Sequence, residues 1–388
     1  MASTNRPPLD PMSRPVPPQT RARYRQRAPL MILAALGLLA GLWAGLIRLG
    51  WQLPPLLLRL PAQHGPLMVS GFLGTLISLE RAVALSQNQG GGRRIYYLSP
   101  LLAGLGALAL FFVLPTAVPR GLSTLGALGL VLIFGVIYSL QPTTDHAVMG
   151  VGALLWLVGN GLWLAGRPIF RVVPWWAGFL ILTIAGERLE LGRVLPHKRI
   201  TRHAFLAVTA VFLAGLLLSL VAFDSGVRLA GLGLIALGVW LLRYDIARRT
   251  MRQKGLTRFI AACLLPGYVW LMVGGLFWLG YGGQYVAGPV YDALLHTLFL
   301  GFVFSMIFGH APVIVPAVLG VQVPYTPIFY LHLGLLHLSL LLRVGGDWLL
   351  WLPLRRWGGL LNEVAVLLFL LVTAVAVRRG KKNEKLGK

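Results

Sequence analysis

The chain has 388 residues, of which 57% are hydrophobic and only 12% are charged, and its mean hydropathy is +0.75. Apolar runs of about twenty residues recur to the end of the chain, which excludes a soluble globular protein and predicts an all-α integral membrane protein. The formal net charge is +24, but most of the 35 Lys and Arg residues fall in alternate connections between these runs. This distribution is typical of the cytoplasmic side of a membrane protein that contacts anionic lipids, so nucleic acid is not an expected partner.

Residues 1–28 are rich in Arg and Pro and lack apolar periodicity, which predicts a disordered basic cytoplasmic arm. A cleaved signal peptide is the alternative interpretation, but the apolar run that follows is too long for the hydrophobic part of such a peptide. We predict a transmembrane domain over residues 29–377 and a basic cytoplasmic tail over residues 378–388. About twelve spans are expected, at 29–50, 65–86, 95–117, 121–140, 147–166, 173–191, 203–223, 226–244, 257–280, 289–314, 326–343 and 359–377. The even number and the basic inner connections predict that both termini are cytoplasmic, in a multi-pass protein of the cytoplasmic (inner) membrane.

The second, sixth and tenth predicted spans carry the same signature at the same spacing. In each of them a Gly-Phe pair is followed, nine residues after the Gly, by a Glu-Arg or His-Ala pair. These are Gly71-Phe72 with Glu80-Arg81, Gly178-Phe179 with Glu187-Arg188, and Gly301-Phe302 with His310-Ala311. A repeat at every fourth helix, always in the same orientation, predicts three pseudo-symmetric four-helix units.

The charged residues at the inner ends of these spans are interpreted as structural ion pairs rather than as catalytic groups. His146 follows Asp145 at a short inner turn and is interpreted as a helix cap or interface residue. Since no carboxylate is expected at mid-depth, a proton-coupled transporter is disfavoured. Cys263 is the only cysteine, which excludes disulfides, thiolate zinc sites and iron–sulfur clusters within the chain. Five tryptophans of the predicted spans are expected to form the aromatic belt at the membrane interface. They are Trp175 and Trp176 at the outer end of the sixth span, with Trp163, Trp270 and Trp278 elsewhere.

Two histidines are expected at matched depth near the outer face. His64 lies seven residues before Gly71 and His296 lies five residues before Gly301, so their depths differ by about 3 Å at 1.5 Å per residue. Ionisable groups in lipid face the interior of a helix bundle, and neutral imidazole is the common protein ligand for haem iron. The pair is therefore a candidate haem site; the competing interpretation is that the many glycines nearby serve helix packing alone.

A second candidate site lies in the inner half of the membrane. His310 is fourteen residues after His296, about 21 Å further along the helix, so one metal cannot bind both. His310, with His332 and His337 on the next span and the proline-rich connection over residues 310–327, is a candidate for a second haem, a copper ion or a quinone. Hydrogen bonding of these histidines to neighbouring helix carbonyls is the alternative.

The segment His64-Gly65-Pro66-Leu67-Met68 resembles the His-Gly-x-x-Met segment of subunit I of haem–copper oxidases. The stretch of residues 296–302, HTLFLGF, is similar to helix segments of NnrS-type membrane haem proteins, which are linked to nitric-oxide metabolism. The resemblance implies twelve helices in three sets of four and a low-spin haem, expected to be haem b, with His64 and His296 as axial ligands. It places Met68 beside the cofactor and makes Asp292 a partner for a haem propionate or a ligand imidazole.

The sixth predicted span carries no His, the seventh no His pair and the tenth no His-x-His. The copper ligands of an oxidase-type binuclear centre are therefore missing, which argues against oxygen or nitric-oxide reduction there. The expected function is electron transfer or sensing in nitric-oxide or respiratory metabolism, with a redox protein or quinone as partner. Two alternatives stay open: a cofactor-free transporter or channel, and a subunit of a larger respiratory complex.

Overall fold

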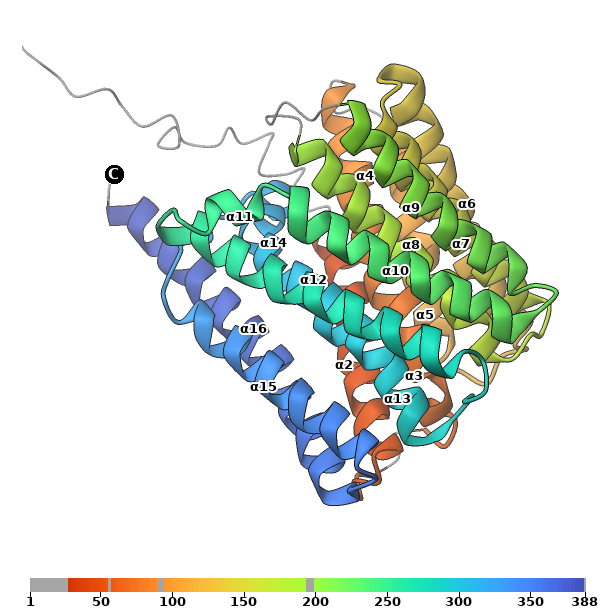
Figure 1. The fold of residues 1–388 in the computed structure, drawn as a ribbon. Coiled ribbons are helices and arrows are strands. Elements are labelled where there is room, and N and C mark those ends of the chain that lie inside the picture. Colours follow the sequence, from red (N-terminus) through yellow and green to blue (C-terminus); the bar gives the residue numbers. More distant parts are fainter. Residues whose placement is uncertain (1–26, 55–56, 90–93, 193–198, 387–388) are drawn as a thin grey trace, which may run out of the picture.

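The computed structural model describes residues 27–54, 57–89, 94–192 and 199–386, and all regular structure in these ranges is helical (Figure 1). Eleven helical segments there are long and apolar enough to cross a membrane. They are α2 (Ala28–Arg48), η2 to α4 (Leu60–Asn88), α6 (Ala117–Leu140), α7 (Thr144–Leu164), α8 (Ile169–Leu191), α9 (Arg199–Leu218), α10 (Phe223–Tyr244), α12 (Gly255–Tyr281), α13 to α14 (Gly288–Leu319), α15 (Phe329–Trp348) and α16 (Leu352–Leu386). The predicted all-α, multi-pass class is confirmed.

Two of these spans change their helical form along their length. The first comprises η2 (Leu60–Gln63), α3 (His64–Pro66), η3 (Leu67–Gly74) and α4 (Thr75–Asn88), and the second comprises α13 (Gly288–His296), η6 (Thr297–Phe304) and α14 (Ser305–Leu319). Both η3 and η6 are π-helices. Three shorter helices connect the spans: η4 (Arg94–Tyr97), α5 (Leu98–Ala109) and α11 (Ala247–Thr250).

The predicted third span, residues 95–117, is shorter than expected. Helix α5 has only 12 residues, about 18 Å at 1.5 Å per residue, which is less than the roughly 30 Å hydrocarbon core of a bilayer. The helix ends at Ala109, and the chain continues through turns to Pro115 before α6 begins at Ala117. The C-terminal parts of α4 and α6 nevertheless meet through Leu85 and Ile133, so the chain between them must return to the opposite face. We therefore find eleven long spans and one short crossing in place of twelve full spans.

The three helices that carry the repeated signature are the most buried spans. Within the most apolar 18-residue stretch of each, 78% of α8 and 67% of the other two are buried, against at most 61% in any other candidate span. Their inner ends also touch one another: Arg81 forms an ion pair with Glu187, and Arg188 Nη1 lies 3.4 Å from His310 Nε2. The repeated positions thus meet in the centre of the molecule, and the structural ion pairs predicted there are present.

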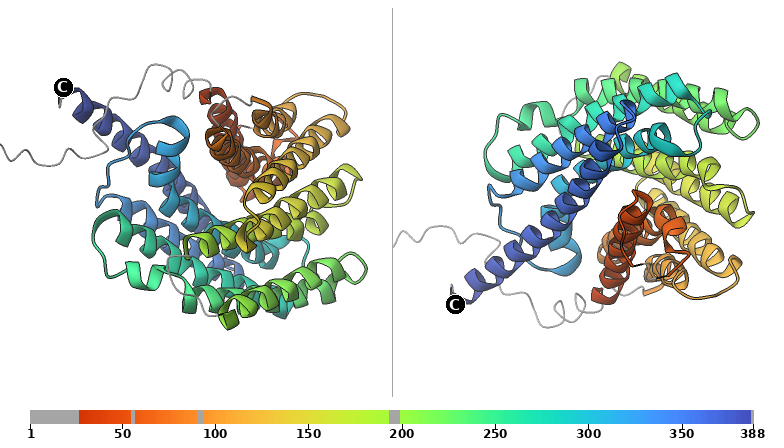
Figure 2. Two further views of the ribbon diagram at one scale, coloured as in Figure 1. Left: turned by 90° about the horizontal axis from the view of Figure 1, so that it is seen from above. Right: turned by 90° about the horizontal axis from the view of Figure 1, so that it is seen from below.

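The other helices are arranged around this centre in chain order, as the views from above and below show (Figure 2). Helices that follow one another in the chain pack in pairs. These pairs are α2 with η3, α5 with α6, α7 with α8, α9 with α10, α12 with η6, and α15 with α16. The last helix, α16, closes the ring on the first, α2: Arg356 donates a hydrogen bond of 2.9 Å to Gly50 O, and the rings of Trp51 and Trp357 lie 5.4 Å apart.

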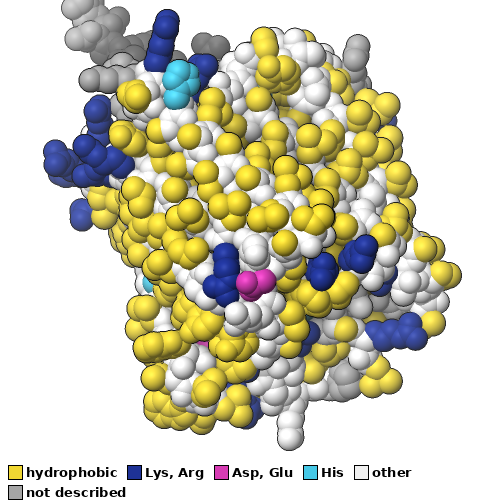
Figure 3. Space-filling model, turned by 45° about the vertical axis from the view of Figure 1, so that its right-hand side comes forward, with side chains coloured by type: hydrophobic (Ala, Val, Ile, Leu, Met, Phe, Trp, Pro, Cys, Tyr) yellow, Lys and Arg dark blue, Asp and Glu magenta, His cyan; other side chains and the backbone are white. Residues whose placement is uncertain are grey.

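Both ends of the membrane domain emerge on one face, which we call the inner face. Arg27 at the start of α2 donates a hydrogen bond to Val318 O at the end of α14, and Gly380 of α16 packs on Gln322. Helix α16 continues to Leu386, so the predicted tail is helical over most of its length. Hydrophobic side chains cover most of the face drawn in Figure 3, as a lipid-facing surface requires. Most of the predicted arm, residues 1–26, lies outside the described residues.

Candidate functional site

The structure brings His64 and His296 together, as their matched depths predict. Their ring centroids lie 6.2 Å apart, and the ring planes make an angle of 35°. His64 is the first residue of α3 and His296 is the last residue of α13, and both helices lie toward the bottom of Figure 1, opposite the inner face. Two residues more than two hundred positions apart therefore share one locus at the outer end of the bundle.

Each of the two imidazoles is held through its Nδ1 atom. His64 Nδ1 lies 2.7 Å from Gly41 O of α2, and His296 Nδ1 lies 2.8 Å from Asp292 O. A carbonyl oxygen only accepts hydrogen bonds, so Nδ1 carries the proton and Nε2 keeps its lone pair. No hydrogen bond in the described part of the chain engages either Nε2 atom. This is how proteins orient a metal-binding histidine.

The separation of the rings suits one metal ion between them. An imidazole nitrogen binds a metal at about 2 Å, and the ring radius adds roughly 1 Å on each side, so two opposed ligands have centroids about 6 Å apart. The observed 6.2 Å agrees with this value.

Both histidines line a cavity of about 310 Å³. Met68 and Gly65 line it on the side of His64, and Trp176 of α8 and Phe304 of η6 line it from the interior. The rest of its wall is largely apolar and includes Leu42, Val69, Leu73, Val173, Phe299 and Leu300. The volume and the lining are those of a site for a mostly apolar ligand with a few polar groups.

Two glycines, Gly45 and Gly65, line this cavity. A Cβ atom on Gly45 would lie 3.2 Å from His64 Cε1 and 3.1 Å from Glu363 Oε1, so only glycine lets α2 approach both groups at this distance. A Cβ atom on Gly65 would lie 3.9 Å from Trp176 and 4.0 Å from Ile169, which is ordinary van der Waals contact, so a methyl group fits there but a larger side chain must enter the cavity. Gly65, the second residue of the His-Gly-x-x-Met segment, therefore faces the cavity.

Arginines and acidic side chains gather at the outer edge of the site. Arg343 Nε and Nη2 lie 2.7 Å and 2.9 Å from the Asp292 carboxylate, and Arg355 lies 2.7 Å from Asp347. Arg48 lines the same cavity and forms no ion pair within the described residues. The Asp292 carboxylate also lies 3.3 Å from His296 Nδ1, so it contacts a proposed ligand imidazole, as expected from the sequence.

Sequence reasoning missed these arginines and Glu363, which also lines the cavity. Arg343 lies at the outer end of a predicted span, and ionisable side chains within a span mark functional candidates. That signal was available for Arg343. The convergence of Arg48, Arg355 and Glu363 on the histidines depends on how α2 and α16 pack, which no local pattern encodes.

A π-helix follows each of the two histidines. Residues 67–74 form η3 directly after α3, and residues 297–304 form η6 directly after α13. In a π-helix each backbone N–H bonds to the carbonyl five residues earlier, a form that is rare and frequent at functional sites. The third signature helix, α8, has no such segment. The two spans that bear the histidines thus differ together from the span that does not.

The inner histidines have separate surroundings. His310 Nδ1 lies 2.7 Å from Met306 O, and His337 Nδ1 accepts a hydrogen bond of 3.1 Å from Trp270. His332 is only 1% exposed, and neither of its ring nitrogens has a hydrogen-bond partner in the described structure. Its neighbours are aromatic rings, those of Phe259, Phe308, Phe329 and Phe369. No group of three metal-ligating side chains among the described residues contains any of these histidines, and the second site stays a prediction.

The prediction of an aromatic belt was wrong for the five tryptophans named above. Each of them is at most 8% exposed, because its ring packs between helices instead of facing lipid. Trp176 is held by a hydrogen bond of 3.0 Å from its Nε1 to Asn160 Oδ1, which fixes its ring at the cavity wall. The exposed tryptophans lie instead at the outer end of the α15–α16 hairpin, at Trp348, Trp351 and Trp357.

Comparison with curated proteins gave no match, and comparison with solved structures gave none either. A family model described as "Domain of unknown function (DUF8744)" matches residues 27–378. The match begins just before α2 and ends within α16, so it includes the first ten candidate spans, most of the last one and both histidines of the site. The chain therefore belongs to this family, the domain of unknown function DUF8744.

Proposed function

We propose that this protein is a haem-binding membrane protein that holds a low-spin haem b between His64 and His296 and serves electron transfer or sensing. The observation that carries the proposal is the pair of rings 6.2 Å apart, each held by a backbone carbonyl at Nδ1 and each with Nε2 unengaged, at the edge of an apolar cavity. A redox protein or a quinone is the expected partner, in nitric-oxide or respiratory metabolism.

The arrangement of the helices supports the resemblance to subunit I of haem–copper oxidases and to NnrS-type proteins. The three signature helices are the most buried spans, and their inner ends contact one another. The basic inner connections support a cytoplasmic inner face in the inner membrane. The sixth and seventh predicted spans lack the oxidase copper ligands, so the proposal involves no oxidase-type binuclear centre.

Once bound, the haem would supply reversible one-electron exchange at its iron. The side chains of this protein have separate tasks around it. Gly41 and Asp292 orient the two imidazoles through their carbonyls, and the Asp292 carboxylate adds a negative charge beside His296. Met68 and Trp176 line the cavity and help to exclude water. Arg48 and Arg343 line it as well, and their guanidinium groups would form ion pairs with carboxylate groups of the ligand.

The proposal is tested by a dithionite-reduced minus oxidised visible spectrum of the detergent-purified protein, together with quantitation of haem in a pyridine extract. Sharp α and β bands with about one haem per chain are expected. A flat spectrum in protein from haem-replete cells would overturn the proposal and favour the cofactor-free transporter.

The position of Gly65 at the cavity wall leads to a first prediction. Gly65→Leu places a branched side chain between His64 and Trp176, so the purified variant is expected to hold less than about half of the wild-type haem because the cavity is filled. Gly161→Leu is the matched control, because a Cβ atom on Gly161 meets nothing within 4 Å. Equal haem content in both variants would contradict the assignment of the cavity.

The unpaired cation at the outer edge leads to a second prediction. Arg48→Gln removes a positive charge that favours the reduced haem, so the midpoint potential should fall by roughly 50 mV, or about 1 kcal/mol. The measurement is a spectroscopic redox titration. Arg120→Gln is the control, because Arg120 donates to Trp163 O on another part of the bundle. A potential that is unchanged in Arg48→Gln would place the haem elsewhere.

A further inference from the structure

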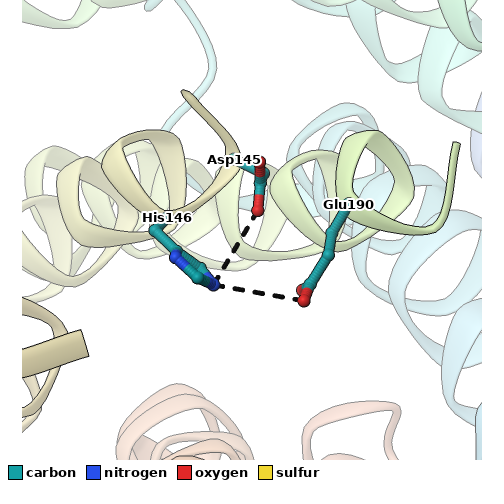
Figure 4. A group of neighbouring side chains, drawn as sticks. All are labelled: Asp145, His146 and Glu190. Carbon is teal, nitrogen blue, oxygen red and sulfur yellow. Dashed lines mark ion pairs between the residues drawn. The ribbon is translucent and has the colours of Figure 1, made fainter. Parts of the chain in front are cut away.

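A second group of ligating side chains lies at the inner face, far along the bundle from the histidine pair. Asp145 and His146 occupy the first turn of α7, and Glu190 lies near the end of α8. Figure 4 shows the three side chains pointing toward one another from the two helices. We propose that Asp145, His146 and Glu190 bind one divalent transition-metal ion, for which zinc is the probe.

The distances leave room for an ion between the three groups, which form ion pairs when His146 is protonated. His146 Nε2 lies 3.8 Å from Asp145 Oδ2 and 4.0 Å from Glu190 Oε1, and the three ligand atoms lie within 4.8 Å of one another. These separations are too long for hydrogen bonds, which rarely exceed about 3.2 Å. Ligand atoms bound at about 2.1 Å around a tetrahedral metal are roughly 3.4 Å apart. Inward movements of a few tenths of an ångström would therefore complete the site.

The histidine is already oriented for ligation. His146 Nδ1 lies 2.9 Å from Gln141 O, so this nitrogen donates its proton to the carbonyl and Nε2 presents a lone pair toward the two carboxylates. The same backbone device orients His64 and His296 at the outer site. His146 thus has the second hydrogen bond that metal-binding histidines usually have.

The donor atoms and their burial indicate the class of ion that would bind. Asp145 is 3% exposed and His146 is 7% exposed, whereas the Glu190 side chain is 39% exposed and leaves a path to the inner face. One imidazole and two carboxylates offer one nitrogen and two oxygen donors to a divalent ion at a largely buried position. Mixed nitrogen and oxygen donors suit zinc and its neighbours better than calcium or magnesium.

A bound ion would join the start of α7 to the end of α8. Glu190 lies one turn beyond Glu187, which forms the ion pair with Arg81 of α4. The metal would therefore fix the inner end of the most buried helix of the bundle, next to the contacts among the three signature helices. This inference does not depend on a haem at the outer site.

The test uses purified full-length protein, stripped of metal with a chelator and titrated with Zn²⁺ in a calorimeter, with metal analysis of the dialysed sample. About one zinc per chain is expected, with affinity at least about tenfold weaker in His146→Ala and in Glu190→Gln. The Glu190→Gln substitution is isosteric and partly exposed, so it tests the site even if His146→Ala does not fold.

Two controls separate this site from others. His203→Ala alters an exposed histidine of α9 and should leave zinc binding unchanged. His64→Ala should also leave it unchanged, which distinguishes this site from the proposed haem site. No zinc binding in the wild-type protein, or equal affinity in the wild-type protein and in both site variants, would overturn the proposal.

Discussion

His64→Ala and His296→Ala each abolish the low-spin haem spectrum of the purified protein while the protein still accumulates in the membrane. We expect this result because the two rings lie 6.2 Å apart at the outer cavity, and no hydrogen bond among the described residues engages the Nε2 atom of either ring. Loss of either leaves the metal with one axial ligand, which changes its spin state or releases the cofactor. The measurement is the reduced-minus-oxidised spectrum with haem quantitation on equal amounts of purified chain.

The matched control is His337→Ala. His337 is also an intramembrane histidine, but it binds Trp270 and lies away from the cavity, so its removal should leave the haem bands in place. Full haem content in both His64→Ala and His296→Ala would refute the axial assignment. Loss in all three variants would instead indicate that the bundle does not tolerate the substitutions, and His64→Met, which keeps an iron ligand of similar length, then serves as the discriminating variant.

Asp245→Asn lowers the free energy of unfolding by about 3–5 kcal/mol, the usual effect of removing one partner of a buried ion pair. The Asp245 carboxylate lies 2.8 Å and 3.0 Å from Arg188 Nε and Nη2, and the two side chains are 1% and 3% exposed. Without the carboxylate, the Arg188 guanidinium remains buried beside His310 with no neutralising charge at that distance. Unfolding by a graded SDS titration in mixed micelles measures the change.

The control is an Asp→Asn substitution at the other end of α10. Asp224→Asn removes the partner of Arg228, but that pair spans one turn of α10 and its side chains are 48% and 31% exposed. Solvent screens such a pair, so no measurable change in unfolding is expected. Equal effects of Asp245→Asn and Asp224→Asn would show that burial of the Arg188 pair contributes nothing to stability.

The fold class and the central contacts could be predicted from local sequence features. Apolar runs predict the spans, and the charged pairs at the inner ends of the signature helices predict ion pairs there, of which the one between Arg81 and Glu187 is present. The proximity of His64 and His296 followed from counting residues to the same Gly-Phe pair. In each case the prediction uses features within single helices and the spacing that these helices share.

Other features could not be predicted because they depend on contacts between helices. The apolar run after Leu98 is long enough for a full span, but it breaks at Ala109, where the chain turns to join α6. The burial of Trp175 and Trp176 depends on their packing against α7 and the cavity, and hydropathy alone places a tryptophan near an interface as readily. The approach of Arg355 and Glu363 to the histidines similarly depends on how α16 closes on α2.

The two π-helices determine how the side chains at the outer end of each span are rotated about the helix axis relative to those at its inner end. In an α-helix each added or removed residue turns everything beyond it by about 100°. His64 lies before η3 and Arg81 lies after it, and the one must face the cavity while the other faces Glu187. A chain that lost one residue within η3 would therefore present only one of these side chains correctly. The length of this segment, and not only its composition, ties the outer site to the inner ion pairs.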